Sequence, residues 1–218
     1  EGRKTIYVGT LAGILPAGPG HSHQAVRDIA SMSAMPGMTL IEPTTPTQVG
    51  AALDWCVDKA AGSCYLRLVS IPCECPDEIA SLPLPEYGRG QVVYEGGDVV
   101  IVAYGPVMVP QALRAAKLLA GEGIGVRVIN LPWLNAVDGD WLLGAVAGAR
   151  HLLTLDNHYI AGGQGQLVRS TLAGKVLLDT VLSLGLTEVP ACGRNDEVLK
   201  HHGLDAESIA ARIRACLA

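Results

Sequence analysis

Several features are missing from this sequence, and each absence narrows the class of protein. The 218 residues contain no phenylalanine, and aromatic residues make up 4%, so the core has to be built from aliphatic side chains. No apolar run reaches the length of a membrane span, and the chain shows no signal peptide. The net charge of −5 argues against nucleic acid or an anionic membrane surface as a partner.

The six cysteines fit neither a disulfide framework nor a zinc site. Cys73 and Cys75 form a Cys-x-Cys pair, but no second cysteine or histidine pair stands at zinc-site spacing, so no metal site is expected. Reduced thiols and a cytoplasmic location are therefore the expectation. The sequence begins with Glu1 rather than methionine, which suggests a trimmed or processed product, or an incomplete parent.

What the sequence does contain is the composition of a globular protein with a large core. Hydrophobic residues make up 49% and charged residues 17% of the chain. In residues 1–70, short apolar segments alternate with segments of helical spacing, which predicts a parallel sheet with crossover helices. We expect strands over 4–8, 38–41 and 64–69, helices over 24–33 and 47–61, and a loop over 9–20.

A proline-rich stretch and a second block of alternating elements follow. Four prolines predict an extended linker over residues 71–90. We then expect strands over 98–103, 126–129 and 151–155 and within 182–189, and helices over 110–121, 138–148, 167–173 and 206–217. Asp138 is placed to cap one of these helices. The sequence therefore predicts an α/β protein of two three-layer α/β/α units, residues 1–70 and 91–218, with largely parallel sheets.

Two histidines at the end of the first loop form the first candidate site. His21 and His23 flank Ser22 just before a predicted helix, and loops after parallel strands are where α/β folds bind ligands. An imidazole there can hydrogen-bond a hydroxyl group or transfer a proton near neutral pH. The alternative is that one histidine caps the helix while the other is solvated.

Two segments of the second block are further candidates. The Asp-Asn-His segment at 156–158 ends a strand, where polar side chains form either a ligand site or a capping and interface network. The glycine-rich turn at 162–165 precedes a helix but lacks the G-x-G-x-x-G spacing, so a tight turn is favoured over nucleotide binding. His201 and His202 are interpreted as surface residues.

Several motifs follow one another along the chain in a fixed order. The run His21-Ser-His-Gln-Ala-Val-Arg-Asp-Ile-Ala, then Met-Pro-Gly-Met and a strand ending in Ile-Glu-Pro, resembles the late part of the pyrimidine-binding domain of the transketolase family, whose members depend on thiamine diphosphate. Segments that resemble the family's C-terminal domain follow in the expected order: Glu95-Gly-Gly-Asp-Val-Val-Ile-Val-Ala-Tyr-Gly, Gly125-Val-Arg-Val-Ile-Asn, Asp156-Asn-His and Gly162-Gly-Gln-Gly. The resemblance covers nearly the whole chain.

The resemblance implies an enzyme that, in its complete form, transfers a two-carbon ketol or acyl unit through a thiamine-diphosphate adduct. Residues 1–70 would be a truncated pyrimidine-binding domain and 91–218 a transketolase C-terminal domain. The diphosphate and Mg²⁺ would bind an N-terminal pyrophosphate-binding portion or subunit, so this chain alone is expected to bind no cofactor and to be inactive. A homodimer or dependence on a partner chain is expected, with a small carbonyl compound as the substrate.

The resemblance also assigns roles to individual residues. His23 matches the histidine of the family's Thr-His-Gln motif and is the expected catalytic residue, with His21 and His158 as expected substrate contacts. No cofactor-binding residue is identified in this chain.

Other positions depart from the family's pattern. Leu11 stands where a histidine is typical, and Ser70 stands where an arginine is expected to bind the acceptor's phosphate. Serine cannot replace a bidentate cation, which puts a sugar-phosphate substrate in doubt. Arg67, expected to point to the opposite face of its strand, is a doubtful substitute.

Two other interpretations stay open. A β-type 2-oxo acid dehydrogenase component or a deoxyxylulose-phosphate synthase would share both domains, and Leu40-Ile-Glu-Pro-Thr-Thr-Pro resembles a turn of the β-component. The second interpretation is a non-catalytic assembly module. The absence of the polar residues that the family has at Leu11 and Ser70 favours it.

Overall fold

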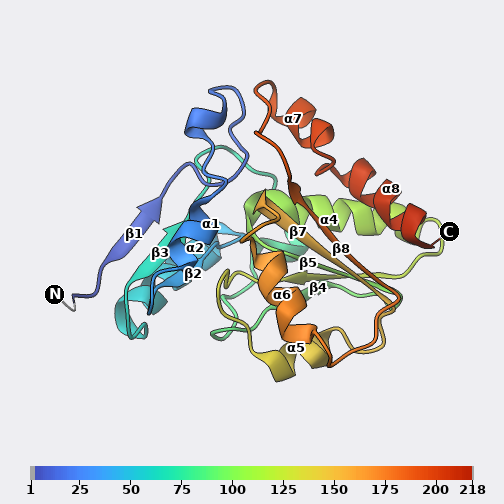
Figure 1. The fold of residues 1–218 in the computed structure, drawn as a ribbon, viewed down its shortest axis with the longest axis horizontal. Coiled ribbons are helices and arrows are strands. Elements are labelled where there is room, and N and C mark those ends of the chain that lie inside the picture. The colour runs from blue at the N-terminus through green and yellow to red at the C-terminus, as the bar shows by residue number, and fades with distance from the viewer. Residues whose placement is uncertain (1–2, 218) are drawn as a thin grey trace.

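Two β-sheets organise the chain, which a computed structural model describes over residues 3–217 (Figure 1). The first sheet has the parallel strand order β1-β3-β2, with β1 at Ile6–Gly9, β2 at Thr39–Ile41 and β3 at Cys64–Arg67. The second has the order β4-β6-β5-β7-β8, with β4 at Gln91–Tyr94, β5 at Val99–Ala103, β6 at Val126–Asn130, β7 at His151–Tyr159 and β8 at Thr180–Leu186. β4 runs antiparallel to β6, and the other pairs are parallel. The predicted α/β fold with largely parallel sheets is confirmed. Residues 1, 2 and 218 lie outside the described residues.

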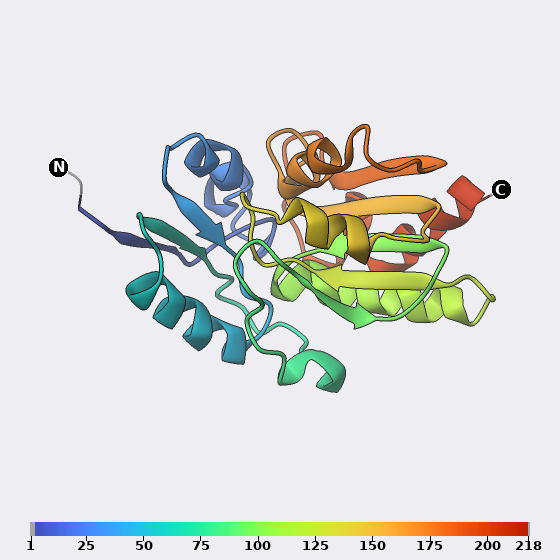
Figure 2. The ribbon, with the colours of Figure 1, turned by 90° about the horizontal axis from the view of Figure 1, so that it is seen from below.

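Helices lie on both faces of each sheet (Figure 2). The first unit contains η1 at His21–His23, α1 at Asp28–Ser33 and α2 at Pro46–Asp58. The second contains α4 at Gly105–Ala120, α5 at Gly139–Ala145, α6 at Gln164–Leu172, α7 at Asn195–His201 and α8 at Ala206–Leu217. A short helix, α3 at Asp77–Ala80, lies between the two units in the sequence. Among the described residues, no helix is long and apolar enough to cross a bilayer.

The strand β5 shows how the second unit is layered. All five of its residues are buried, as expected for a central parallel strand covered on both faces. Val99 and Ile101 pack in the same cluster as residues of α4 and α8, whereas Val100 and Val102 pack with residues of α5 and α6. The alternation of side chains along the strand thus builds two aliphatic layers, one on each side of the sheet.

Local sequence explains the beginnings of two helices. The side chain of Thr45 accepts a hydrogen bond from the N–H of Gln48, and Pro46 opens α2 at a position where its missing N–H costs nothing. The side chain of Asp138 accepts bonds from the N–H groups of Asp140 and Trp141, so the predicted cap of α5 is confirmed.

Several element boundaries were wrong. The stretch 71–90 contains α3 and is not entirely extended, and β4 and α7 were not predicted. The helix α4 begins at Gly105 rather than at residue 110. Pro106 stands in its first turn, where a missing N–H costs nothing, and Pro110 lies inside the helix instead of opening it. β3 ends at Arg67 rather than at residue 69, and β7 continues to Tyr159.

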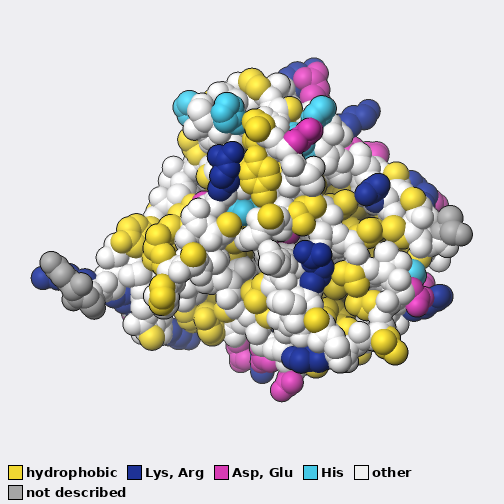
Figure 3. Space-filling model, viewed as in Figure 1, with side chains coloured by type: hydrophobic (Ala, Val, Ile, Leu, Met, Phe, Trp, Pro, Cys, Tyr) yellow, Lys and Arg dark blue, Asp and Glu magenta, His cyan; other side chains and the backbone are white. Residues whose placement is uncertain are grey.

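The two edges of the first sheet differ. The β2 edge is covered by the second unit, since the N–H of Leu134 donates to the carbonyl of Leu40 at 2.9 Å and Ile41 forms a bridge with Trp133. Over residues 3–217, β1 pairs with β3 and has no strand on its other side. Its Tyr7 and Val8 are 48% and 50% exposed, and hydrophobic side chains gather over the first unit in Figure 3.

Candidate functional site

The loop after β1 leads to two of the predicted site histidines and is fixed by the second unit. The N–H of Ile14 donates to Oδ1 of Asn157 on β7 at 2.8 Å, and the N–H of Ala17 donates to Oδ1 of Asn195 on α7 at 3.0 Å. Gly13 has φ +82°, and a Cβ there would lie 2.1 Å from Nδ2 of Asn157. Glycine is therefore required for this approach of the loop to β7.

His21 and His23 occupy η1 at the end of this loop, and both are exposed. The Oγ of Ser22 lies 3.1 Å from Nδ1 of His23, which leaves Nε2 of that ring open to another partner. Gln24, the next residue, is buried and donates to the carbonyl of Ile14 at 2.7 Å. No histidine caps α1, whose N-cap residue is Arg27 without a side-chain bond. Two exposed imidazoles thus stand beside an anchored glutamine, and their roles stay predictions.

His158 lies in a different environment from the other two histidines. Its side chain is fully buried in β7. Nε2 accepts from the N–H of Ala30 at 3.4 Å, and Nδ1 donates to the carbonyl of Tyr159 at 2.7 Å. Burial lowers the pKa of His158, which favours the neutral ring. The ring therefore joins β7 to α1 with both nitrogens engaged, and its contact with a substrate stays a prediction.

Arg67 is the centre of a buried ionic network that sequence reasoning missed. Its Nε donates to Oδ2 of Asp28 at 2.8 Å, and its Nη1 donates to Oε2 of Glu42. Its Nη2 donates to the carbonyl groups of Ala25 and Asn157, both at 2.9 Å. The side chains of Arg67 and Glu42 are both 0% exposed. The guanidinium is thus committed to the protein and cannot serve as a surface anion site.

Burial raises the pKa values of two acidic groups in this region. Desolvation raises the pKa of Glu42 although Arg67 lowers it. Desolvation also raises the pKa of Asp156 to about 7, against the hydrogen bonds that it accepts. These bonds come from the hydroxyl of Tyr104 at 3.1 Å and the N–H of Gly165 at 3.1 Å. The sequence did carry one sign of this buried network, because Glu42 and Arg67 are charged residues within apolar segments.

The carboxyl edge of the first sheet carries neutral side chains at the two positions that differ from the family's pattern. Leu11 forms an antiparallel bridge with Val69, and the hydroxyl of Ser70 donates to the carbonyl of Thr10. Neither Leu11 nor Ser70 offers a cation to a phosphate group.

The glycine-rich turn before α6 could hold the cofactor's diphosphate only if its N–H groups were open. The N–H of Gly165 already donates to Oδ2 of Asp156, and a Cβ on Gly163 would lie 2.7 Å from Oδ1 of the same carboxylate. The N–H of Gly165 at the positive end of α6 is therefore already bound by a carboxyl group of the chain and is not open to an anion. This turn does not fit a diphosphate with its Mg²⁺, and the tight turn that the sequence favoured is what the structure contains.

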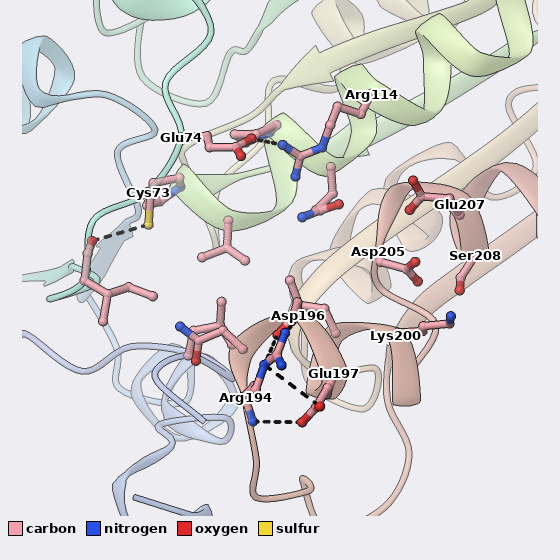
Figure 4. Close-up of a pocket in the computed structure, with 18 of the residues that line it drawn as sticks. Cys73, Glu74, Arg114, Arg194, Asp196, Glu197, Lys200, Asp205, Glu207 and Ser208 are labelled. Atoms are coloured by element: carbon pink, nitrogen blue, oxygen red, sulfur yellow. Dashed lines mark hydrogen bonds and ion pairs between the residues drawn. The ribbon is translucent and has the colours of Figure 1, made fainter. Parts of the chain in front are cut away.

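A cavity of about 820 Å³ lies between the segment 71–74 and the helices α4, α7 and α8 (Figure 4). Its rim is charged: Arg114 pairs with Glu74, and Nη2 of Arg194 lies 2.7 Å from Asp196. None of the three predicted site histidines lines it. Its lining comes from distant segments, so no local pattern could have predicted it.

Comparison with known proteins agrees with this architecture of two α/β units. Residues 1–70 match the transketolase pyrimidine-binding domain, and residues 88–209 match the transketolase C-terminal domain. The chain belongs to the transketolase family.

The relatives are longer than this chain. A Methanocaldococcus jannaschii protein described as a transketolase C-terminal section is 33% identical over 207 residues, which cover 94% of this chain and 64% of that protein. A 1-deoxy-D-xylulose-5-phosphate synthase of Thermomicrobium roseum is 35% identical over 205 residues, covering 91% of this chain and 32% of the synthase. The solved structure of a split-gene transketolase, an inactive β4 tetramer, matches with a TM-score of 0.82 and 30% identity over 97% of this chain and 66% of that chain.

Proposed function

We propose that this chain is the C-terminal section of a transketolase-type enzyme that transfers a two-carbon ketol or acyl unit when an N-terminal portion completes it. Residues 1–70 would contribute part of the pyrimidine-binding domain, 71–90 the connection and 91–218 the C-terminal domain. The thiamine diphosphate and Mg²⁺ would bind chiefly to the N-terminal portion. The chain alone would then bind no cofactor and be inactive.

The observation that carries this proposal is the open edge of β1. An edge strand presents unpaired N–H and C=O groups and is a template for pairing with another chain. Tyr7 and Val8 add exposed apolar surface on this strand. We propose that the N-terminal portion pairs along β1 and covers these side chains, whether it is part of a longer chain or a separate subunit.

The exposed histidines would then face the completed site. We propose His23 as the catalytic residue and His21 as a substrate contact, on a small carbonyl compound. His158 is also proposed as a substrate contact, but its ring is buried and would have to give up its hydrogen bond with Ala30 or Tyr159 to reach the substrate. An imidazole can hydrogen-bond a hydroxyl or carbonyl oxygen and move a proton near neutral pH. Because Leu11 and Ser70 offer no cation, we propose an acceptor without a phosphate group at this position.

Calorimetry with thiamine diphosphate and Mg²⁺ tests whether cofactor binding requires the N-terminal portion. The chain alone should give no binding heat, and the chain copurified with its N-terminal portion should bind the cofactor. Tight binding by the chain alone would refute the proposal.

The open edge has its own test. Val8→Lys on β1 should weaken assembly with the N-terminal portion at least about tenfold, because a charge would be desolvated at the contact. Val57→Lys is a matched control, since Val57 is also exposed, at 57%, but lies on α2. Equal assembly of the two variants would exclude the β1 edge as the contact.

We also propose that the assembly contains two copies of this chain and works in the cytoplasm. Light scattering on the copurified assembly measures the first of these, and a single copy per particle would contradict it.

A further inference from the structure

Two histidines and a glutamate converge at the end of α7. Glu188 lies in the loop between β8 and α7, His201 is the last residue of α7, and His202 is its C-cap. One ligand atom of each residue lies within 4.8 Å of the other two. Over residues 3–217, no other group of three such side chains brings its nitrogen, oxygen or sulfur atoms this close together.

The end of the helix explains how neighbouring histidines can converge. On a continuous helix, consecutive side chains point about 100° apart and do not face each other. Here α7 stops, His202 has φ −88° and ψ 2°, and Gly203 turns the chain with φ +68°. The two imidazole rings lie perpendicular with centroids 4.8 Å apart. Both rings can therefore approach a single ion.

We propose that Glu188, His201 and His202 bind one divalent transition-metal ion of the zinc class. Imidazole nitrogen and carboxylate oxygen are ligands that zinc accepts at about 2.0–2.2 Å, which places two ligand atoms roughly 3.3 Å apart. The Nε2 of His201 lies 3.6 Å from Oε1 of Glu188, and these side chains are 59% and 67% exposed. They are free to close the remaining distance, and water would complete the coordination. Mg²⁺ and Ca²⁺ prefer all-oxygen sites and would bind poorly.

The third ligand already has a partner, and this gives the site a structural consequence. Nε2 of His202 accepts a hydrogen bond of 3.0 Å from the N–H of Ala191. A neutral imidazole has one nitrogen lone pair, so a metal ion and this amide compete for it. The carbonyl of Ala191 accepts from Nε2 of Gln24 at 3.4 Å, and Gln24 follows His23. Metal binding would therefore release the Ala191 amide in a loop that contacts the histidine-bearing turn.

Zinc binding is measured on the full chain, freed of any affinity tag, by competition with a chromophoric chelator. We expect one zinc ion per chain. Loss of partners that only orient a metal ligand costs about 10–100-fold in affinity, so His201→Gln and Glu188→Gln should each weaken binding at least about tenfold. Both side chains are exposed, so circular dichroism should show unchanged folds. His21→Gln and Glu197→Gln are matched controls, exposed residues outside the cluster, and should bind as the wild type does.

The amide of Ala191 reports on the third ligand. In a ¹H–¹⁵N NMR spectrum, zinc should shift the Ala191 amide resonance in the wild type and not in H201Q at the same zinc concentration. No zinc binding, or equal binding by H201Q and the wild type, would overturn the site. Zinc binding that leaves the Ala191 resonance unchanged would exclude His202 as a ligand and overturn the three-residue assignment.

Discussion

Nη2 of Arg67, on β3, donates a hydrogen bond of 2.9 Å to the carbonyl oxygen of Asn157, on β7, and so joins the two units of the molecule. The same guanidinium forms ion pairs with Asp28 and Glu42, which both come from the first unit. A single buried cation is therefore shared by two carboxylates and links one sheet to the other.

Removal of this cation should be strongly destabilising. Arg67→Met leaves the buried carboxylate of Glu42 unpaired, and breaking a buried ion pair in this way costs about 3–5 kcal/mol of the free energy of unfolding. Urea unfolding followed by circular dichroism measures the loss. Arg150→Met is the matched control, because its guanidinium is 70% exposed and pairs with Asp179 at the surface. The control should lose less than about 1 kcal/mol. Equal losses in the two variants would show that the buried network contributes little.

Asp156 should make stability depend on pH. Burial raises the pKa of Asp156 in the folded chain to about 7, from an ordinary value of 3.8. The folded state then holds a proton that the unfolded chain releases between these values. The contribution of Asp156 to the free energy of unfolding is therefore fully present below about pH 4 and is lost as the pH rises through about 7.

Asp156→Asn should remove this loss. The free energy of unfolding of the wild type, relative to D156N, should fall by on the order of 3 kcal/mol between pH 4 and pH 8. Urea unfolding at each pH unit measures the two curves. Asp54→Asn on the exposed surface of α2 is the control and should follow the wild type. Curves for D156N and the wild type that stay parallel would contradict the prediction.

The loop before η1 offers a clean test of steric fit. Gly13 and Gly123 both have positive φ, +82° and +81°, so alanine at either position pays the same backbone cost, about 1 kcal/mol. A Cβ at Gly13 would also meet the side chain of Asn157, whereas a Cβ at Gly123 would meet nothing within 4 Å. Gly13→Ala should therefore lose at least about 1 kcal/mol more than Gly123→Ala in thermal or urea unfolding. Similar losses would mean that the loop moves away from β7 without cost.

Local patterns predicted the elements that depend on local sequence. The apolar run of β5 and the cap at Asp138 were recognisable, because burial on both faces and a helix N-terminus each leave a signal within a few residues. β4 was missed because its four residues are only partly buried or exposed and follow a proline-rich stretch. The network of Arg67 depends on partners 25, 39 and 90 residues away in the sequence. Hydrophobic periodicity reflects only local structure and cannot predict contacts over such separations. The position of His21 and His23 between a loop and a predicted helix made both of them candidates, and the motif order then singled out His23.

The role of His23 can be separated from that of its neighbour His21 in the assembly with the N-terminal portion. His23→Gln should lower kcat by about 100-fold or more if the imidazole moves a proton during the reaction, because general acid–base groups contribute about 10²–10⁴. His21→Gln, an equally exposed change two residues away, should lower kcat less than about tenfold and act mainly on KM. Cofactor affinity and assembly should stay within about threefold of the wild type in both variants, since these exposed side chains anchor neither the loop nor β1. The catalytic assignment fails if H23Q keeps the wild-type kcat, or if its loss of activity follows a loss of assembly.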